Sequence, residues 1–177
     1  MNSENNSRTS LFLMELIIAI FFFSLAAAVS IKLFVSAHTL AKSSTELSNA
    51  TIWAQSLSEA FYGYNGDIPK IAELFPSSYS TQDTIIIVFD KEWNPLLDSR
   101  EEAYYEALLK TETADASVVY SDVTDYGNNY SGKAVKGDVA VLNIQNTEVV
   151  PSSVPEDKSM IIINYSVDTL LDQKESE

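Results

Sequence analysis

The sequence of 177 residues has no cysteine, a single histidine and only five glycines. The missing cysteines exclude disulfides, thiolate nucleophiles and cysteine-ligated metals. One histidine, His38, is poor material for a catalytic triad, which needs a histidine beside a nucleophile and an orienting acid. The glycines form no G-x-x-x-x-G-K-[ST] loop for a nucleotide phosphate. The sequence therefore offers no catalytic constellation, and we expect no enzyme activity.

Basic residues are also scarce, with 11 lysines and arginines against 25 acids and a formal net charge of −14. Residues 43–177 hold 23 of the acids and 8 of the bases, so this part carries a net charge of −15. Such a surface repels phosphate backbones. We therefore expect no nucleic-acid partner, and we interpret the negative charge mainly as a contribution to solubility.

Two groups of polar residues have the side chains for acid–base chemistry or metal binding. They are Asp90, Glu92 and Asp98 in the first, and Asp122, Asp125, Asn128 and Asn129 in the second. The second group does not have the spacing of the twelve-residue calcium loop and no glutamate closes it. We expect a solvated loop and a plain turn respectively, with no metal and no cofactor. Trp53 and the nine tyrosines are expected in helix–sheet packing.

One long apolar run stands out near the N-terminus, from Leu11 to Ile31, in which only Glu15, Ser24 and Ser30 are polar. As a helix its 21 residues measure about 32 Å, enough for a hydrocarbon core of about 30 Å. The run is therefore predicted to cross a membrane once.

Three interpretations of this run compete. It could be a signal peptide cut after residues 26–28, or a permanent signal anchor. In both, Glu15 is an unexplained cost, since a charge at mid-span costs about 2.5–3.5 kcal/mol and less near a helix end. In the third, cleavage between Ser10 and Leu11 creates an ammonium group one helical turn from Glu15. Only this interpretation gives the acid a partner.

The stretch Ser10-Leu-Phe-Leu-Met-Glu-Leu16 resembles the processing site of type IV prepilins and pseudopilins. In that family a polar leader ending in glycine precedes Phe-Thr-Leu-x-Glu-Leu and an apolar helix. The matching positions are Ser10 before the cut, Leu11 first, Leu13 third, Glu15 fifth and Leu16 sixth. Ser10, Leu11 and Phe12 depart from the usual Gly, Phe and Thr.

The resemblance implies leader cleavage at Ser10–Leu11 by a prepilin peptidase, N-methylation of Leu11, and pairing of Glu15 with the N-terminus of an adjacent subunit. The implied partners are that peptidase, other pilin-like subunits, the inner-membrane assembly platform with its ATPase, and membrane lipid. It implies a single-pass bacterial membrane protein with a cytoplasmic N-terminus and an outer sheet domain, later carried into an extracytoplasmic filament or pseudopilus.

The predicted helix continues beyond the apolar run, because no proline or glycine occurs between Leu11 and Tyr62. Apolar residues recur at spacings of three and four, and Leu40, Leu47, Ala54 and Phe61 lie seven apart. We expect this stripe to pack on a sheet of the same chain. Gly63, Gly66 and Pro69 supply the end of the helix.

The rest of the chain is predicted to form four or five short strands in a mostly antiparallel sheet. The expected strands are Thr84–Phe89, Tyr104–Thr113, Ser117–Tyr120, Ala134–Ile144 and Met160–Val167, with a turn at Trp93–Pro95 and a chain break at Pro151–Pro155. A long helix on one face of such a sheet is an α+β fold of the pilin-like kind.

The predicted organisation is a cytoplasmic leader at 1–10, a transmembrane and assembly segment at 11–35, an amphipathic helix at 36–62, a sheet domain at 63–172 and a tail at 173–177. The leader and the tail are expected to lack regular structure. The predicted function is that of a minor pilin or pseudopilin in a type IV pilus or a type II secretion-like pseudopilus. The alternative is a membrane-anchored extracytoplasmic binding domain.

Overall fold

The computed structural model describes residues 3–97, 102–121, 131–145, 147 and 150–171, with side chains from Ser10 onward. The chain divides into two compact units, Met1–Thr45 and Glu46–Glu177. Helix α1 (Ser3–Gly63) runs through the boundary between them. Each unit is described on its own below.

Helix α1 has 61 residues, as expected for a stretch without internal proline or glycine before Gly63. It begins at Ser3, so the expectation that the leader lacks regular structure is wrong from Ser3 onward; no helix breaker separates these residues from the apolar run. The helix closes where Gly66 N–H donates to the Phe61 carbonyl over 2.9 Å. Gly66 has a φ of +75°, a conformation that favours glycine.

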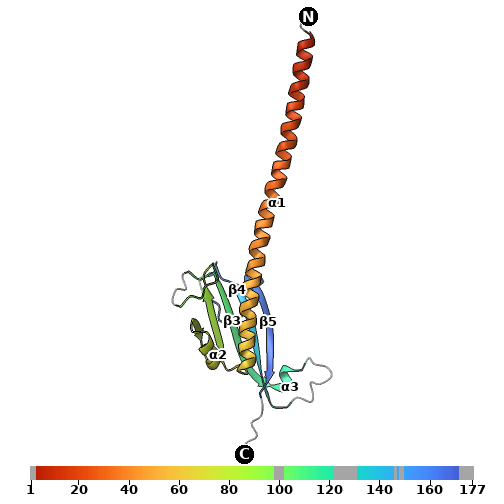
Figure 1. Ribbon diagram of the computed structural model, residues 1–177. Coiled ribbons are helices and arrows are strands. Elements are labelled where there is room, and N and C mark those ends of the chain that lie inside the picture. Colours follow the sequence, from red (N-terminus) through yellow and green to blue (C-terminus); the bar gives the residue numbers. More distant parts are fainter. Residues whose placement is uncertain (1–2, 98–101, 122–130, 146, 148–149, 172–177) are drawn as a thin grey trace, which may run out of the picture. The chain divides into compact units, whose positions relative to one another are not determined.

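The second unit contains a five-stranded antiparallel sheet in the order β1-β2-β3-β4-β5, so each strand pairs with the next one along the chain. The last turns of α1 lie against this sheet (Figure 1), which confirms the predicted α+β fold. The strands are β1 (Ser78–Ser80), β2 (Thr84–Phe89), β3 (Tyr105–Asp115), β4 (Lys133–Asn143) and β5 (Ile161–Leu170).

The main core lies between α1 and the sheet. Alternate residues of each central strand face the helix, as the register of Ile85 with Leu109 and of Leu109 with Val139 requires. The buried hydrophobic residues of α1 are Ala50, Ala54, Leu57, Ala60 and Phe61. Four of these five are alanine or leucine at helical spacing, and the small alanines let the helix lie close to the strands.

A second, smaller core covers the opposite face of the sheet. Its buried residues are Val88, Leu108, Ala140, Leu142 and Ile144. Val150, Val154 and Met160 pack against them, so the segment around the predicted chain break forms a cover for this face. Both Val141 and Leu142 are buried, one in the core on each face of β4.

One predicted strand is wrong. Residues Ser117–Tyr120 were expected to be extended, but α3 (Ala116–Val119) is a single helical turn closed by Tyr120 N–H donating to the Ala116 carbonyl over 3.0 Å. The β-branched valines favour a strand only weakly. The turn comes directly after β3, where the chain must leave the sheet.

Two elements were missed. Helix α2 (Ile68–Leu74) begins at Asp67, whose side chain caps Lys70 N–H, and Pro69 occupies its first turn. Asp-Ile-Pro is a helix-start signal, whereas Pro69 was interpreted only as a stop. Strand β1 has three residues, too few for a periodic pattern.

The predicted seven-residue stripe is only half buried. Ala54 and Phe61 are fully buried, but Leu40 and Leu47 are 72% and 49% exposed. Leu47 belongs to the second unit but about half of its side chain stays exposed. Leu40 belongs to the other unit.

Phe61 is the largest fully buried side chain of α1, and its ring lies against Gly137 of β4, where a Cβ would approach Phe61 Cε2 to 3.0 Å. We predict that Phe61→Ala lowers the free energy of unfolding by about 3–5 kcal/mol, because the lost ring leaves a cavity. Urea unfolding of the chain in detergent, followed by the fluorescence of Trp53 and Trp93, measures this.

Ile52→Ala is the matched control, since Ile52 is on the same helix but 56% exposed. Its effect should stay within about 0.5 kcal/mol. Equal losses from the two substitutions would contradict this assignment of the core.

Candidate functional site

The unit Met1–Thr45 presents an apolar helix whose described side chains are nearly all exposed. Leu11 is 65% exposed, Phe23 76% and Phe34 74%. The helix is long and apolar enough to cross a membrane, by its length and composition. Most of the exposed large hydrophobic side chains among the described residues lie in this unit, and a surface of this kind calls for lipid or protein cover.

The three predicted site residues lie within two turns at the start of this surface. Ser10, Leu11 and Glu15 are all exposed and helical, and Leu11 and Glu15 are one turn apart at i and i+4. A bond cut between Ser10 and Leu11 would thus place the new amine and the acid on the same side of the helix.

The other polar side chains of the run are satisfied by their own helix. Ser24 Oγ donates to the Ile20 carbonyl over 2.8 Å, and Ser30 Oγ donates to the Ala26 carbonyl over 2.9 Å. An ionised carboxylate can only accept hydrogen bonds, and the backbone N–H groups around Glu15 are engaged in α1. Glu15 therefore needs a donor from outside its own helical backbone.

His38 is exposed on α1. Across the part of the chain that the structure describes, no three His, Asp or Glu side chains come close enough together to hold a metal ion. Asp98, Asp122, Asp125, Asn128 and Asn129 lie outside the described residues.

Asp90 organises the turn after β2. Its Oδ1 accepts hydrogen bonds from Glu92 N–H over 2.9 Å and Asn94 N–H over 2.8 Å, and its Oδ2 accepts from Asn94 Nδ2 over 2.9 Å. These bonds, those of Asn94 foremost, lower the pKa of the Asp90 carboxyl. Glu92 instead forms an exposed ion pair with Lys91. Asp90 therefore holds the turn and Glu92 pairs with a lysine, so the two side chains do not form an acid–base pair.

The same turn holds Trp93 at a φ of +67°, which is unusual for a bulky residue. Its ring stacks on Tyr105 with centroids 4.0 Å apart and planes at 12°. Trp53 packs on Phe89 and Phe75 nearby, in line with its predicted packing role. Stacking and the Asp90 hydrogen bonds together offset the local backbone strain.

Tyr105 links this aromatic cluster to α1. Its hydroxyl donates to Glu46 Oε1 over 2.8 Å, and the residue is 2% exposed. Burial, and then the nearby Glu46 carboxylate, raise the pKa of the Tyr105 phenol far above its ordinary value. Glu46 is the first residue of α1 in the second unit, so this hydrogen bond lies at the start of that unit.

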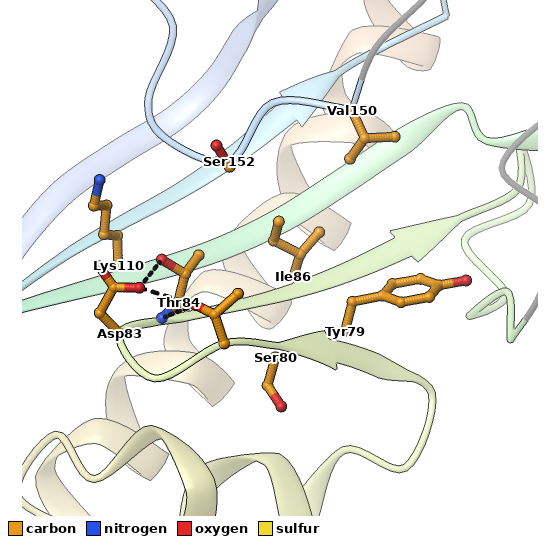
Figure 2. A pocket seen from close by; sticks show the side chains of 9 residues that line it. Tyr79, Ser80, Asp83, Thr84, Ile86, Lys110, Val150 and Ser152 are labelled. Atoms are coloured by element: carbon orange, nitrogen blue, oxygen red, sulfur yellow. Dashed lines mark hydrogen bonds between the residues drawn. The ribbon is translucent and has the colours of Figure 1, made fainter.

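A hollow of about 390 Å³ opens beside β1 and β2 (Figure 2). Tyr79, Ile86 and Val150 line its apolar part, and Asp83, Lys110 and Ser152 lie toward the other end. Asp83 Oδ1 accepts hydrogen bonds from the hydroxyls of Thr81 (2.9 Å) and Thr84 (3.1 Å), which lower the pKa of its carboxyl. Asp83 therefore fixes the β1–β2 turn.

Sequence reasoning did not single out Glu106, whose side chain is fully buried in β3. In the register it stands opposite Val88 and Leu142, on the face of the smaller core. No signal in the sequence indicated this burial, because the periodicity of the stretch Tyr104–Glu112 is ambiguous between strand and helix.

The raised pKa of Tyr105 predicts how the free energy of unfolding changes at alkaline pH. A phenol whose pKa is raised in the folded chain stabilises folding below pH 10, its unfolded value, and loses this contribution as the pH rises further. The free energy of unfolding should thus fall above pH 10 more steeply than in Tyr105→Phe, by up to about 1.4 kcal/mol per pH unit. Urea unfolding at pH 8.5, 10.5 and 11.5 checks this; parallel profiles of the two chains would contradict it.

Comparisons with known proteins add no relative, since no family model, no curated protein and no solved structure matches the chain.

Proposed function

We propose that the chain is a pilin-like subunit, a minor pilin or pseudopilin, that is cut by a prepilin peptidase and assembled into a type IV pilus or a type II secretion-like pseudopilus. The observation that carries the proposal is Glu15, an acid one turn after Leu11 on an exposed apolar helix. An acid in a membrane span marks a functional position and requires a named partner.

The amine of Leu11 is that partner. Cleavage after Ser10 creates an ammonium group where the precursor had a neutral peptide bond. Within one chain, or between neighbours offset by about one turn, the ammonium and Glu15 neutralise each other at about the same depth. The pair then removes most of the penalty for burying either charge among apolar side chains.

Assembly replaces lipid around the segment 11–35 by helices of other subunits. Apart from Glu15, Lys32 and two serines the segment is apolar on all sides, with Phe12, Phe21 and Ile31 all more than 60% exposed, so it suits either environment. In the bundle, packing between helices provides the contact area. The pair of Glu15 with the amine of Leu11 fixes the register of neighbouring helices.

The proposed partners follow from these steps. The peptidase acts on Ser10–Leu11 at the cytoplasmic side and methylates Leu11. The assembly platform with its ATPase extracts the subunit from membrane lipid, and other pilin-like subunits receive its helix. The acidic sheet unit, with its own core, then faces the outside of the cell.

Cleavage gives the first test. Co-expression with a prepilin peptidase should remove residues 1–10, with an added methyl group on Leu11, because the cut precedes the motif Leu11–Leu16. Intact-mass spectrometry measures both changes. Ser10→Gly, which restores the family residue, should be processed at least as fast, and Ser10→Trp should block processing. A wild-type precursor that stays whole would point to the anchored binding domain instead.

Glu15 gives the second test, which concerns assembly after cleavage. Glu15→Gln should be cut normally but should reduce filament or pseudopilus yield at least tenfold, equivalent to about 1.4 kcal/mol per subunit contact. Sheared or cross-linked assemblies, quantified by immunoblot, provide the measurement. Glu59→Gln is the control, since it removes an exposed acid from the same helix in the other unit. Unchanged yield for Glu15→Gln would reject the proposal.

A further inference from the structure

We propose that Lys32 is a second counter-charge for Glu15, supplied by a neighbouring copy whose helix is offset by 17 residues. This inference rests on the proposed function and names a second contact for the same acid. It comes from the charges and apolar side chains of the unit Met1–Thr45, in which both residues lie exposed on α1.

Lys32 has no acid within reach on its own helix. The nearest acids along α1 are Glu15 and Glu46, 17 and 14 residues away, or about 25 Å and 21 Å. A lysine on a helix pairs with acids three or four positions away. Glu46 belongs to the second unit, where it accepts the Tyr105 hydroxyl. Glu15 lies in the same unit as Lys32, and the separation of about 25 Å along the helix requires that a contact between the two come from another chain.

The exposed apolar side chains fit the same offset. At 17 residues, position i of one helix is level with position i+17 of the next, so Leu16 meets Leu33 and Ile18 meets Val35. Phe23 then meets Leu40. Leu33, Val35 and Leu40 are 65%, 58% and 72% exposed, although they lie beyond the apolar run Leu11–Ile31. The offset covers them with the membrane segment of the neighbour.

A flat membrane does not permit this contact. Two single-span chains in one bilayer keep their apolar segments level, because each segment fills a core of about 30 Å. An offset of about 25 Å would move most of one segment out of the bilayer. Contact between Glu15 and Lys32 therefore belongs to the assembled bundle, whereas the amine of Leu11 needs an offset of only about 6 Å.

Disulfide trapping tests the offset cleanly, because the chain has no cysteine of its own. Ala19→Cys and Ser36→Cys lie one turn beyond Glu15 and Lys32, on nearly the same sides of the helix. Disulfides require Cα atoms within about 7 Å. Co-produced in cells that assemble the chain, the two variants should give at least ten times more dimer than either variant alone.

A second pair reports on the proposed function separately. Phe22→Cys with Ala26→Cys traps the four-residue offset that the amine of Leu11 requires. Dimer from 22/26 without dimer from 19/36 would overturn the role of Lys32 and leave the proposed function intact. If neither pair gives dimer, the role of Lys32 and the pairing of Glu15 with the amine of a neighbouring chain are both overturned.

The charge itself is tested by Lys32→Gln in the 19/36 background. This substitution should lower the yield of dimer at least fivefold, while Lys42→Gln, which removes a cation from the same helix farther along, should leave it unchanged. If Lys32→Gln leaves the yield of dimer unchanged, packing alone sets the offset and the assignment of Lys32 is overturned.

Discussion

The contact between one face of α1 and the sheet is the interaction on which the second unit depends. It is narrow, since only residues 50–61 of a 61-residue helix are buried in it. Alanines at 50, 54 and 60 bring the helix close to the strands, and the Phe61 ring occupies the space that Gly137 leaves open. Without this helix, the inward residues of β2, β3 and β4 would face water along one whole side of the sheet.

Much of this arrangement could be predicted from the sequence, and the reason is periodicity. The uninterrupted helix follows from a long pattern that averages out local exceptions, and the strand Thr84–Phe89 follows from a continuous β-branched run. Short elements escape such patterns. Helix α2 and strand β1 have seven and three residues, and α3 is one turn whose valines suggested a strand. The structure of these short elements is decided by capping and by reversal of the chain direction. Of these features, only the cap at Asp67 could be recognised in the sequence.

The candidate site could be predicted to the extent that it is linear. Ser10, Leu11 and Glu15 are neighbours in sequence, so the relation between cut and acid needs no tertiary information. The Tyr105–Glu46 bond joins residues 59 positions apart, and the stack of Trp93 on Tyr105 depends on a left-handed turn. Contacts of this kind follow from strand register, which the sequence leaves open until the sheet is assembled.

The sequential order of the strands has a consequence for how the chain folds. Every strand pairs with its neighbour in sequence, so each hairpin closes a local loop, and such topologies fold faster than sheets with distant pairings. The helical face they cover, however, is synthesised before any of them. During translation, the apolar face of residues 50–61 stays exposed until β3 and β4 have been synthesised. Misassembly and chaperone binding are therefore favoured most during this interval.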